Sequence, residues 1–271
     1  MPELPEVETT RRGIAPHIVG ERISQVIVRD RRLRWPVPRN INKQLTGQTV
    51  SRVDRRAKYL LIYTEDACLI MHLGMSGSLR IIKNETPPNK HDHLDIVFES
   101  DTILRLRVPR RFGSIHVTTG DPLKHELLRH LGPEPLDNSF DGNYLYLKSR
   151  GRKQGVKTFI MDSRNVVGIG NIYACEALFS AGITPRRAAG RISRERYTKL
   201  AAAIKAVLND AIRAGGTTLR DYVSGDGNPG FFELQLRVYG KTGRPCPRCK
   251  KPIEQIRQGQ RSTFYCPHCQ H

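Results

Sequence analysis

The chain has 271 residues, which is long enough for two domains that each bury a hydrophobic core. Lysine and arginine number 45 against 26 acidic residues, and the formal net charge of +19 favours a polyanionic partner, either a nucleic acid or an anionic membrane surface. No apolar run has the length of a membrane span and no signal-peptide pattern opens the sequence, so we expect a cytoplasmic protein without a membrane-spanning segment.

The first part of the chain predicts one helix followed by many short strands. The helix begins at about Pro5 and has Leu4, Val7 and Ile14 available for its buried side. Apolar or alternating runs then predict strands within residues 22–30, 58–64, 67–74, 78–83, 94–100 and 102–108. So many short strands separated by turn-prone segments favour a β-sandwich or a barrel-like sheet.

The second part of the chain has helical patterns. Residues 123–132 carry apolar residues at helical spacing, and residues 170–181 predict a helix that ends at Gly182. A clearer helix over 193–214 begins at Ser193 as its N-cap and ends before a pair of glycines. We expect this helix to bury one apolar stripe, because its leucine, isoleucine and alanine residues recur on one side.

These patterns together predict an α+β protein with three parts. A β domain of the sandwich or barrel-like kind occupies residues 1–132, a helical domain residues 133–236 and a four-cysteine zinc finger residues 237–271. The first boundary coincides with the turn-rich stretch "GPEPLDNSFDGN".

Four cysteines near the C-terminal end have the spacing of a zinc site, CxxC-x16-CxxC: Cys246, Cys249, Cys266 and Cys269. Each CxxC pair lets two thiolates reach one tetrahedral Zn²⁺, and four thiolates leave no position open for a substrate. A redox dithiol needs only one such pair and usually a thioredoxin-like context, which the surrounding sequence lacks. We therefore predict one structural zinc ion, with His268 exposed and not a ligand. Cys68 and Cys175 stand in apolar surroundings and are expected in the core.

The first residues, "MPELPEVET", concentrate carboxylates just behind a proline. One interpretation is helix chemistry, because proline suits the first turn of a helix and glutamate suits the positive end of its dipole. The other is catalysis. Removal of Met1 would leave Pro2 as a terminal secondary amine, and an α-amino group, with a reference pKa of about 8, is a readier nucleophile than lysine, with about 10.4. Attack on a sugar C1′ would give an iminium ion that permits β-elimination, with Glu3 placed to move protons. The residues alone favour the helical interpretation over the catalytic one.

Eight motifs occur together and in this order: "PELPEVET", "RRAKYL", "HLGMSGSLR", "KHDH", "PRRFG", "VVGIGNIYACEALFSAGI", "GGTTLRDY" and the four-cysteine finger. Over essentially the whole chain this combination resembles the formamidopyrimidine-DNA glycosylase family. The resemblance implies a β-sandwich catalytic domain, a helix–two-turn–helix domain and a zinc finger. It also implies a bifunctional DNA glycosylase and AP lyase of base excision repair. Such an enzyme excises 8-oxoguanine and formamidopyrimidines from double-stranded DNA through a Schiff base and β,δ-elimination, and we expect a monomer.

The resemblance assigns catalytic roles to residues that match the family motifs. Pro2 is the implied Schiff-base nucleophile and Glu3 the implied general acid. Lys58 in "RRAKYL" is the implied proton donor in the elimination. Arg261 on the finger hairpin is the implied proton donor or phosphate ligand for δ-elimination, whereas spacing alone indicates a solvated surface charge there.

The resemblance also implies DNA contacts, at His91, Arg110, Arg152, Lys157 and Asn171. The match at Arg152 is loose because the neighbouring residues differ, and Asn171 could equally be an N-cap. Three side chains are the implied wedge that fills the gap left by a flipped nucleotide: Met75, Arg110 and Phe112. Core packing is the usual place for a methionine or a phenylalanine, but the glycines that flank Met75 and Phe112 favour exposed loops. Extruding a base costs stacking and pairing energy, which an inserted side chain partly recovers. Residues 223–232 correspond to the loop that closes over the damaged base in this family.

One position departs from the family pattern. Val108 stands before Pro109, where an acidic residue is expected. A carboxylate that could orient the wedge arginines is therefore absent from that position, and discrimination of the orphaned base is less secure than the lyase chemistry.

Two alternatives remain at this point. The related endonuclease VIII prefers oxidised pyrimidines, but "PELPEVET" and the intact "PRRFG" disfavour it. A zinc-ribbon DNA-binding protein without catalysis would explain the charge and the finger. That alternative leaves Pro2, Glu3 and Lys58 without a role.

Overall fold

The computed structural model describes residues 2–83, 86–216 and 235–271, and they divide into two compact units. Of the described residues, the first unit contains 2–129 and 214–216, and the second contains 130–213 and 235–271. The segment that contains the four cysteines of the predicted zinc site therefore belongs to the same unit as residues 130–213. The domain boundaries after residues 132 and 236 stay predictions. In the described part of the chain, no helix combines the length and the apolar character needed to cross a membrane.

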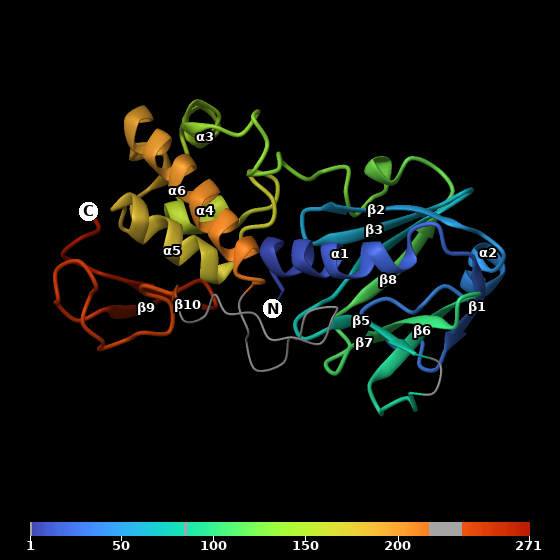
Figure 1. Cartoon of the computed structure of the whole chain (residues 1–271). Coiled ribbons are helices and arrows are strands. Elements are labelled where there is room, and N and C mark those ends of the chain that lie inside the picture. Colours follow the sequence, from blue (N-terminus) through green and yellow to red (C-terminus); the bar gives the residue numbers. More distant parts are fainter. Residues whose placement is uncertain (1, 84–85, 217–234) are drawn as a thin grey trace. The chain divides into compact units, whose positions relative to one another are not determined.

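The first unit is a β-sandwich of two four-stranded antiparallel sheets (Figure 1). One sheet has the order β1 (Ile23–Val28), β6 (Asp92–Phe98), β7 (Thr102–Arg107) and β5 (Ser78–Lys83). The other has the order β2 (Val50–Arg56), β3 (Tyr59–Thr64), β4 (Cys68–His72) and β8 (Ser114–Thr118). Alternate residues such as Leu60 and Ile62 of β3, or Leu104 and Leu106 of β7, are buried in one core. The predicted sandwich is confirmed.

Helix α1 (Leu4–Ile18) packs against strands of both sheets. The expected residues Leu4, Val7 and Ile14 are fully buried, and Pro5 lies in the first turn. On another side of the helix, Glu8 accepts hydrogen bonds from arginines of α1 and β2. This packing fixes the start of the chain on the sandwich. A short helix α2 (Ile41–Leu45) lies beside β1.

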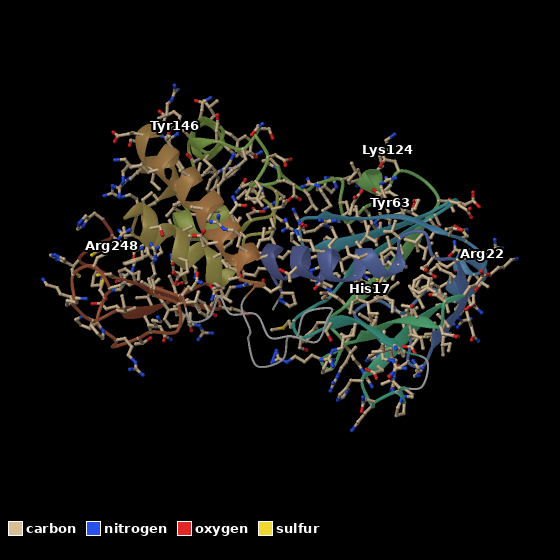
Figure 2. All side chains as sticks on the ribbon, in the orientation of Figure 1. His17, Arg22, Tyr63, Lys124, Tyr146 and Arg248 are labelled. Carbon is tan, nitrogen blue, oxygen red and sulfur yellow. The ribbon has the colours of Figure 1, made fainter. Side chains whose placement is uncertain are left out.

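The helix predicted over 123–132 is wrong. The structure has a 3₁₀ helix, η1 (Pro122–Lys124), followed by hydrogen-bonded turns, and Figure 2 labels Lys124 in it. Leu123 is 51% exposed whereas Leu128 is buried, so the apolar residues do not share one buried face. Without such a face, helical spacing contributes little to stability.

The second unit combines helices with a small hairpin. Its elements are α3 (Gly142–Ser149), α4 (Val156–Met161), α5 (Asn171–Ala181), η2 (Ala189–Arg191), α6 (Arg194–Arg213), β9 (Glu254–Gln258) and β10 (Arg261–Tyr265). As predicted, α5 ends at Gly182, which adopts a left-handed conformation with φ of 68°. The Ser193 hydroxyl accepts a hydrogen bond from the Arg196 amide, and α6 buries Leu200, Ile204 and Leu208. The predicted N-cap and apolar stripe are confirmed.

The finger segment is fixed to α5 by a buried carboxylate and an apolar cluster. Glu176 is buried, and its carboxylate accepts hydrogen bonds from the amides of three consecutive residues, Arg237, Val238 and Tyr239, at 2.9–3.0 Å. Three amide donors satisfy a buried carboxylate well. Beside it, Phe179 of α5 packs with Val238, Ile253 and Phe264. The hairpin is thus supported from the helical side as well as by its cysteines.

The C-terminal end of α5 is covered by Arg248, which Figure 2 labels. Its guanidinium donates to the carbonyl oxygens of Phe179 and Ser180 at 3.1 and 3.0 Å and lies over the Phe179 ring. An arginine is well placed there, because the last carbonyl groups of a helix lack partners within the helix. The finger therefore caps the helix on which it packs.

Candidate active-site residues and metal centre

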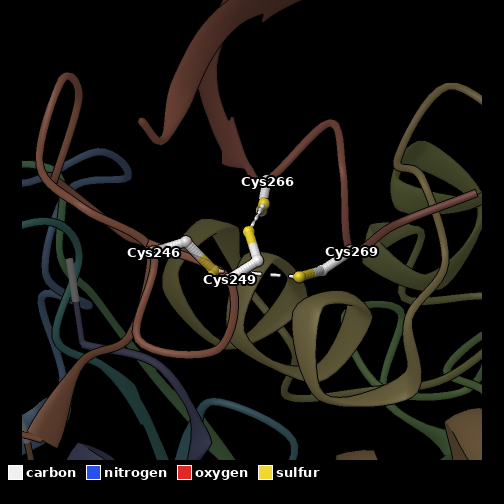
Figure 3. Close-up of side chains that lie close together, drawn as sticks. All are labelled: Cys246, Cys249, Cys266 and Cys269. Atoms are coloured by element: carbon white, nitrogen blue, oxygen red, sulfur yellow. Dashed lines mark hydrogen bonds between the residues drawn. The ribbon is translucent and has the colours of Figure 1, made fainter. Parts of the chain in front are cut away.

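The four cysteines of the finger converge on one point (Figure 3). Their Sγ atoms all lie within 4.8 Å of one another, with 3.5 Å between Cys249 and Cys266 and 3.9 Å between Cys246 and Cys269. A tetrahedral Zn²⁺ with Zn–S bonds of about 2.3 Å requires S–S separations of about 3.8 Å. The four thiols therefore fit one structural zinc ion, as predicted. His268 is exposed, which agrees with its expected place outside the ligand set.

Arg261 is the first residue of β10 and is exposed at the tip of the hairpin. It pairs with Gln258 of β9, and Gly259 between them has φ of 58°, a conformation that glycine adopts without strain. Together with Lys157 and Arg164, Arg261 lines a pocket of about 430 Å³ within the second unit. The finger hairpin thus presents an exposed arginine at a pocket whose lining also includes the ion pair of Arg164 with Asp162.

Lys157 and Asn171 lie in direct contact. Lys157 is 2% exposed, and its ammonium group donates to Asn171 Oδ1 and Thr263 Oγ1, both at 2.6 Å. Asn171 in turn donates to the carbonyl oxygen of Ser262 at 2.9 Å. Asn171 is the first residue of α5, after the N-cap Gly170, so it is not the N-cap. One buried lysine therefore joins α4, α5 and β10.

Arg152, the loosest of the predicted DNA contacts, is exposed in the turn between α3 and α4. Its backbone amide donates to Ser149 O, and its carbonyl oxygen accepts from the Gly190 amide. The turn is therefore fixed while the side chain extends away from the core. The loop predicted at residues 223–232 lies outside the described residues.

The N-terminal residues form the beginning of α1. Pro2 and Glu3 are both buried, and Glu3 is the N-cap, with a carbonyl oxygen that accepts from the Val7 amide at 3.1 Å. The Glu3 amide donates to Glu6 Oε2 at 2.8 Å, as in a capping box. The helical interpretation of the acidic run is confirmed. The catalytic interpretation of Pro2 and Glu3 stays a prediction.

Lys58 lies in the two-residue turn between β2 and β3, after Ala57, which has φ of 56°. Burial, with the nearby charges of Lys58 and Arg34, lowers the pKa of His72 to about 4. His72 is therefore neutral at physiological pH, and its Nδ1 accepts a hydrogen bond from the Gly74 amide at 2.9 Å. The turn that carries Lys58 thus adjoins the loop that follows β4.

The three predicted wedge residues come together on two loops of the first unit. Met75 is 40% exposed and Phe112 is 51% exposed, as their glycine neighbours predicted, and Arg110 Nη1 lies 3.9 Å from Met75 Sδ. The loops touch backbone to backbone, because a Cβ atom on Gly74 would lie 2.5 Å from the Gly113 nitrogen. Two large apolar side chains are therefore held in solvent next to an arginine, an unusual arrangement for a surface without a binding role.

His91 precedes β6 on a loop that a buried arginine holds. Arg105 of β7 donates to the carboxylate of Asp95, its cross-strand neighbour, at 2.8 and 2.9 Å. The same guanidinium donates to the carbonyl oxygens of Thr86 and Pro87 on the loop before His91. His91 O also accepts from the Val108 amide. Arg105 was not identified in the sequence analysis. The available signal was a charged residue between two buried leucines, Leu104 and Leu106, which places Arg105 on the opposite face of β7.

Comparisons with known proteins agree with this arrangement. Residues 1–115 match the family described as the formamidopyrimidine-DNA glycosylase N-terminal domain, and residues 131–223 match its H2TH domain. Residues 243–271 match the zinc finger found in FPG and IleRS. The formamidopyrimidine-DNA glycosylase of Pseudomonas putida is 59% identical, and that of Stutzerimonas stutzeri 58% identical, over 270 residues that span both chains completely.

Solved structures are similar over nearly the same length. A mutant of Lactococcus lactis FPG, in complex with a DNA that contains Fapy-dG, is 35% identical with a TM-score of 0.93 and covers 99% of each chain. MutM (FPG) of Thermus thermophilus is 38% identical with a TM-score of 0.88 and covers 99% of this chain and 98% of that one. The resemblance drawn from the motifs is confirmed, and this chain belongs to the formamidopyrimidine-DNA glycosylase family.

Proposed function

We propose that this protein excises oxidised purines from double-stranded DNA and then cleaves the strand at the resulting abasic site, with Pro2 as the nucleophile. Family membership over the whole chain carries the proposal. The Lactococcus lactis protein was crystallised with a Fapy-dG lesion, which supports ring-opened purines as substrates here. We further propose that the protein acts in the cytoplasm as a monomer.

The nucleophile is the secondary amine that removal of Met1 exposes. Its nitrogen forms a bond to C1′ of the damaged nucleotide while the bond from C1′ to the base breaks, and the base leaves with a proton. The nitrogen then loses its proton, and the bond between C1′ and the ring oxygen O4′ breaks as O4′ takes up a proton. The opened sugar is left as an iminium ion, which withdraws electrons from C2′ and makes loss of a C2′ proton possible. The bond between C3′ and its phosphate oxygen then breaks, which is the β-elimination.

Proton transfers need groups close to the reacting atoms. Glu3 adjoins Pro2 in sequence and caps the same helix, so it is the proposed general acid. Lys58, at the tip of a tight turn of the first unit, is the proposed proton donor in the first elimination. Arg261 on the finger hairpin is the proposed residue for the δ-elimination, in which the bond to the second phosphate breaks.

The proposed DNA contacts combine two exposed arginines and a half-buried histidine with one positioned amide. His91, Arg110 and Arg152 belong to loops that the fold holds in place. Asn171 lies at the beginning of α5, where a helix dipole favours a phosphate group, and Lys157 fixes its side chain. The proposed wedge of Met75, Arg110 and Phe112 enters the duplex where the damaged nucleotide leaves it.

Borohydride trapping tests the proposal, because it converts an iminium intermediate into a stable covalent adduct. The full-length protein, shown by mass analysis to lack Met1, should form an adduct on a duplex with 8-oxoguanine, and Pro2→Gly should abolish it. An adduct that survives Pro2→Gly but disappears with Lys58→Ala would identify Lys58 as the nucleophile. Absence of any adduct would favour a zinc-ribbon DNA-binding protein without catalysis.

A further inference from the structure

We propose that Asp30 is a positioning residue for the wedge, and that its carboxylate takes over the task of the acid expected at position 108. The inference rests on the proposed function, because the wedge role of Arg110 and Phe112 belongs to that function. It begins from an ion pair on the first unit. Asp30 Oδ2 accepts a hydrogen bond from Arg111 Nη2 at 3.1 Å, and Arg111 lies between the two wedge residues in the sequence.

The Asp30 carboxylate is itself held in one orientation. The backbone amide and Nε of Arg32 both donate to Oδ1 at 2.9 Å, and Arg32 Nη2 donates to Oδ2 at 3.0 Å. These bonds and the charge of Arg111 lower the pKa of Asp30, so the carboxylate is ionised at neutral pH. His93 Nδ1 donates to the Asp30 carbonyl oxygen at 3.1 Å, which fixes the backbone at the same residue. A preorganised acceptor is what positions a flexible arginine.

The wedge turn needs such an anchor because its backbone is strained. Arg111 has φ of 58°, a left-handed conformation that costs a residue with a side chain about 1 kcal/mol. Its amide donates to Val108 O at 3.1 Å, which closes the turn on one side. On the other side, the Arg34 amide donates to Gly113 O at 3.0 Å. The segment from Asp30 to Arg34 therefore holds the turn through one side chain and one backbone bond.

Position 108 has a packing task that a carboxylate would not fulfil. Val108 is fully buried, and its two methyl groups lie 3.2 and 3.3 Å from the place that a Cβ atom on Gly113 would take. An ionised group there would be desolvated beneath the turn. Asp30 provides the negative charge from the side and at the surface. In this proposal the carboxylate is not lost from the protein. It is supplied by Asp30 instead of by an acidic residue at position 108.

The ion pair also separates the tasks of two neighbouring arginines. Asp30 pairs with Arg111, whereas the Arg110 guanidinium contacts Met75 Sδ. Arg111 is therefore the anchored residue and Arg110 the presented one. An arginine presented in this way can bond to the edge of the base that has lost its partner. Asp30 should consequently affect which opposite base is accepted and how well the wedge enters, and it should leave the covalent chemistry unchanged.

The test compares Asp30→Asn with Asp54→Asn in the full-length, zinc-loaded protein. Asp54 is a matched control, because its carboxylate pairs with Arg52 on the exposed side of β2. Three quantities are measured: the ratio of excision rates for 8-oxoguanine opposite cytosine and opposite adenine, the fluorescence change of a 2-aminopurine next to the lesion, and cleavage of a single strand with a preformed abasic site. The single strand has no opposite base, so it reports the lyase chemistry without the wedge.

With Asp30→Asn we expect a reduced 2-aminopurine change and a base-opposite ratio altered by about fivefold or more, which corresponds to about 1 kcal/mol of positioning energy. Cleavage of the single strand should stay at the wild-type rate, and Asp54→Asn should match the wild type throughout. Arg111→Gln should reproduce the Asp30→Asn result, and the double variant should be no worse than either single one, because both remove the same ion pair. Asp30→Glu should restore much of the wild-type behaviour.

Two results would overturn the inference. One is an Asp30→Asn protein with the wild-type ratio and fluorescence change. The other is an Asp30→Asn protein in which single-strand cleavage falls by the same factor as duplex excision, since Asp30 would then support the fold in general. Failure of the proposed function is distinguishable from both, because the wild-type protein itself would then give no adduct and no cleavage on any substrate.

Discussion

The ammonium group of Lys157 lies 2.6 Å from Asn171 Oδ1, and the lysine is buried. Its other acceptors, Thr263 Oγ1 and Ser262 O, belong to the strand that begins with Arg261. One cation therefore sets the geometry of both the α5 N-terminus and the finger hairpin. This arrangement explains how a residue predicted to bind DNA can affect binding through the residues that it orients.

Replacement of Lys157 by methionine should weaken DNA binding about tenfold and lower the free energy of unfolding of the second unit by about 2 kcal/mol, because one buried and two partly buried acceptors lose a charged donor. Fluorescence anisotropy with an abasic-site duplex measures the first effect and chemical denaturation the second. Lys148→Met on the exposed side of α3 is the control and should change neither. Zinc content should remain at one ion per chain. Wild-type affinity in Lys157→Met would contradict the positioning role.

Zinc removal should abolish DNA binding while the β-sandwich remains folded. The hairpin with Arg261 depends on the cysteine site, whereas the sandwich has its own core. Chelation, or Cys249→Ser, should therefore eliminate duplex binding, and amide hydrogen exchange should show unchanged protection in β3 and β7. Return of zinc to the chelated protein should restore binding. A metal-free protein that still bound and cleaved DNA would refute the structural role of the metal.

The salt dependence of DNA binding should distinguish phosphate contacts made by charged side chains, such as Arg261, from the contact made by the neutral amide of Asn171. Each lysine or arginine that neutralises a phosphate contributes about one unit to the slope of log K against log salt. Arg261→Gln should reduce the slope by about one. Asn171→Ala should weaken binding without a change in slope, because an amide carries no charge. A slope close to zero for the wild type would contradict a basic DNA-binding surface.

Glu8 should stabilise the first unit in a pH-dependent way. Burial alone raises the pKa of this carboxyl group, but hydrogen bonds and charges from Arg11, Arg12 and Arg55 lower it from 4.5 to about 2. The stabilisation is complete above pH 4.5 and is lost as the pH falls toward 2.

Glu8→Gln should consequently reduce the free energy of unfolding at pH 7 by about 2 kcal/mol and flatten its decline below pH 4.5, as measured by urea denaturation across that range. The control is Glu99→Gln, since Glu99 forms an ion pair with Arg22 in which both side chains are exposed. If the free energy of unfolding of Glu8→Gln declined below pH 4.5 as it does in the wild type, the arginine cluster would not stabilise α1.

Local patterns predicted the parts of the fold that show a clear apolar run or a turn residue. The strand β3 is a short continuous apolar run, β7 has Leu104 and Leu106 on either side of a charged residue, and Gly182 marks the end of α5. The strand β2 was not predicted, because its exposed and half-buried positions are arginines, a serine and an aspartate that conceal the two buried valines, Val50 and Val53. The segment after Pro122 was misassigned for the opposite reason, since helical spacing there is not accompanied by a buried face.

The candidate site was predictable only where its residues are close in sequence. CxxC spacing located the zinc ligands, and glycines next to Met75 and Phe112 indicated exposed loops. The ion pair between Asp30 and Arg111 joins positions that are 81 residues apart, and the bonds from Lys157 to the hairpin span more than a hundred. A local sequence pattern does not predict such long-range contacts, because they depend on the tertiary fold that brings distant segments together.

Two of the four metal-site thiols differ from the two cysteines outside the finger in their access to small oxidants. Burial raises the pKa of Cys68 to about 12, and Cys175 is buried, so these two thiols are poor targets for peroxide, which attacks thiolates. Cys249 and Cys269 are partly exposed, and zinc keeps its ligands in the thiolate form. Peroxide should therefore expel the metal before it harms the sandwich. Oxidising conditions, which also create oxidised bases, should therefore lower the fraction of this protein that can bind DNA.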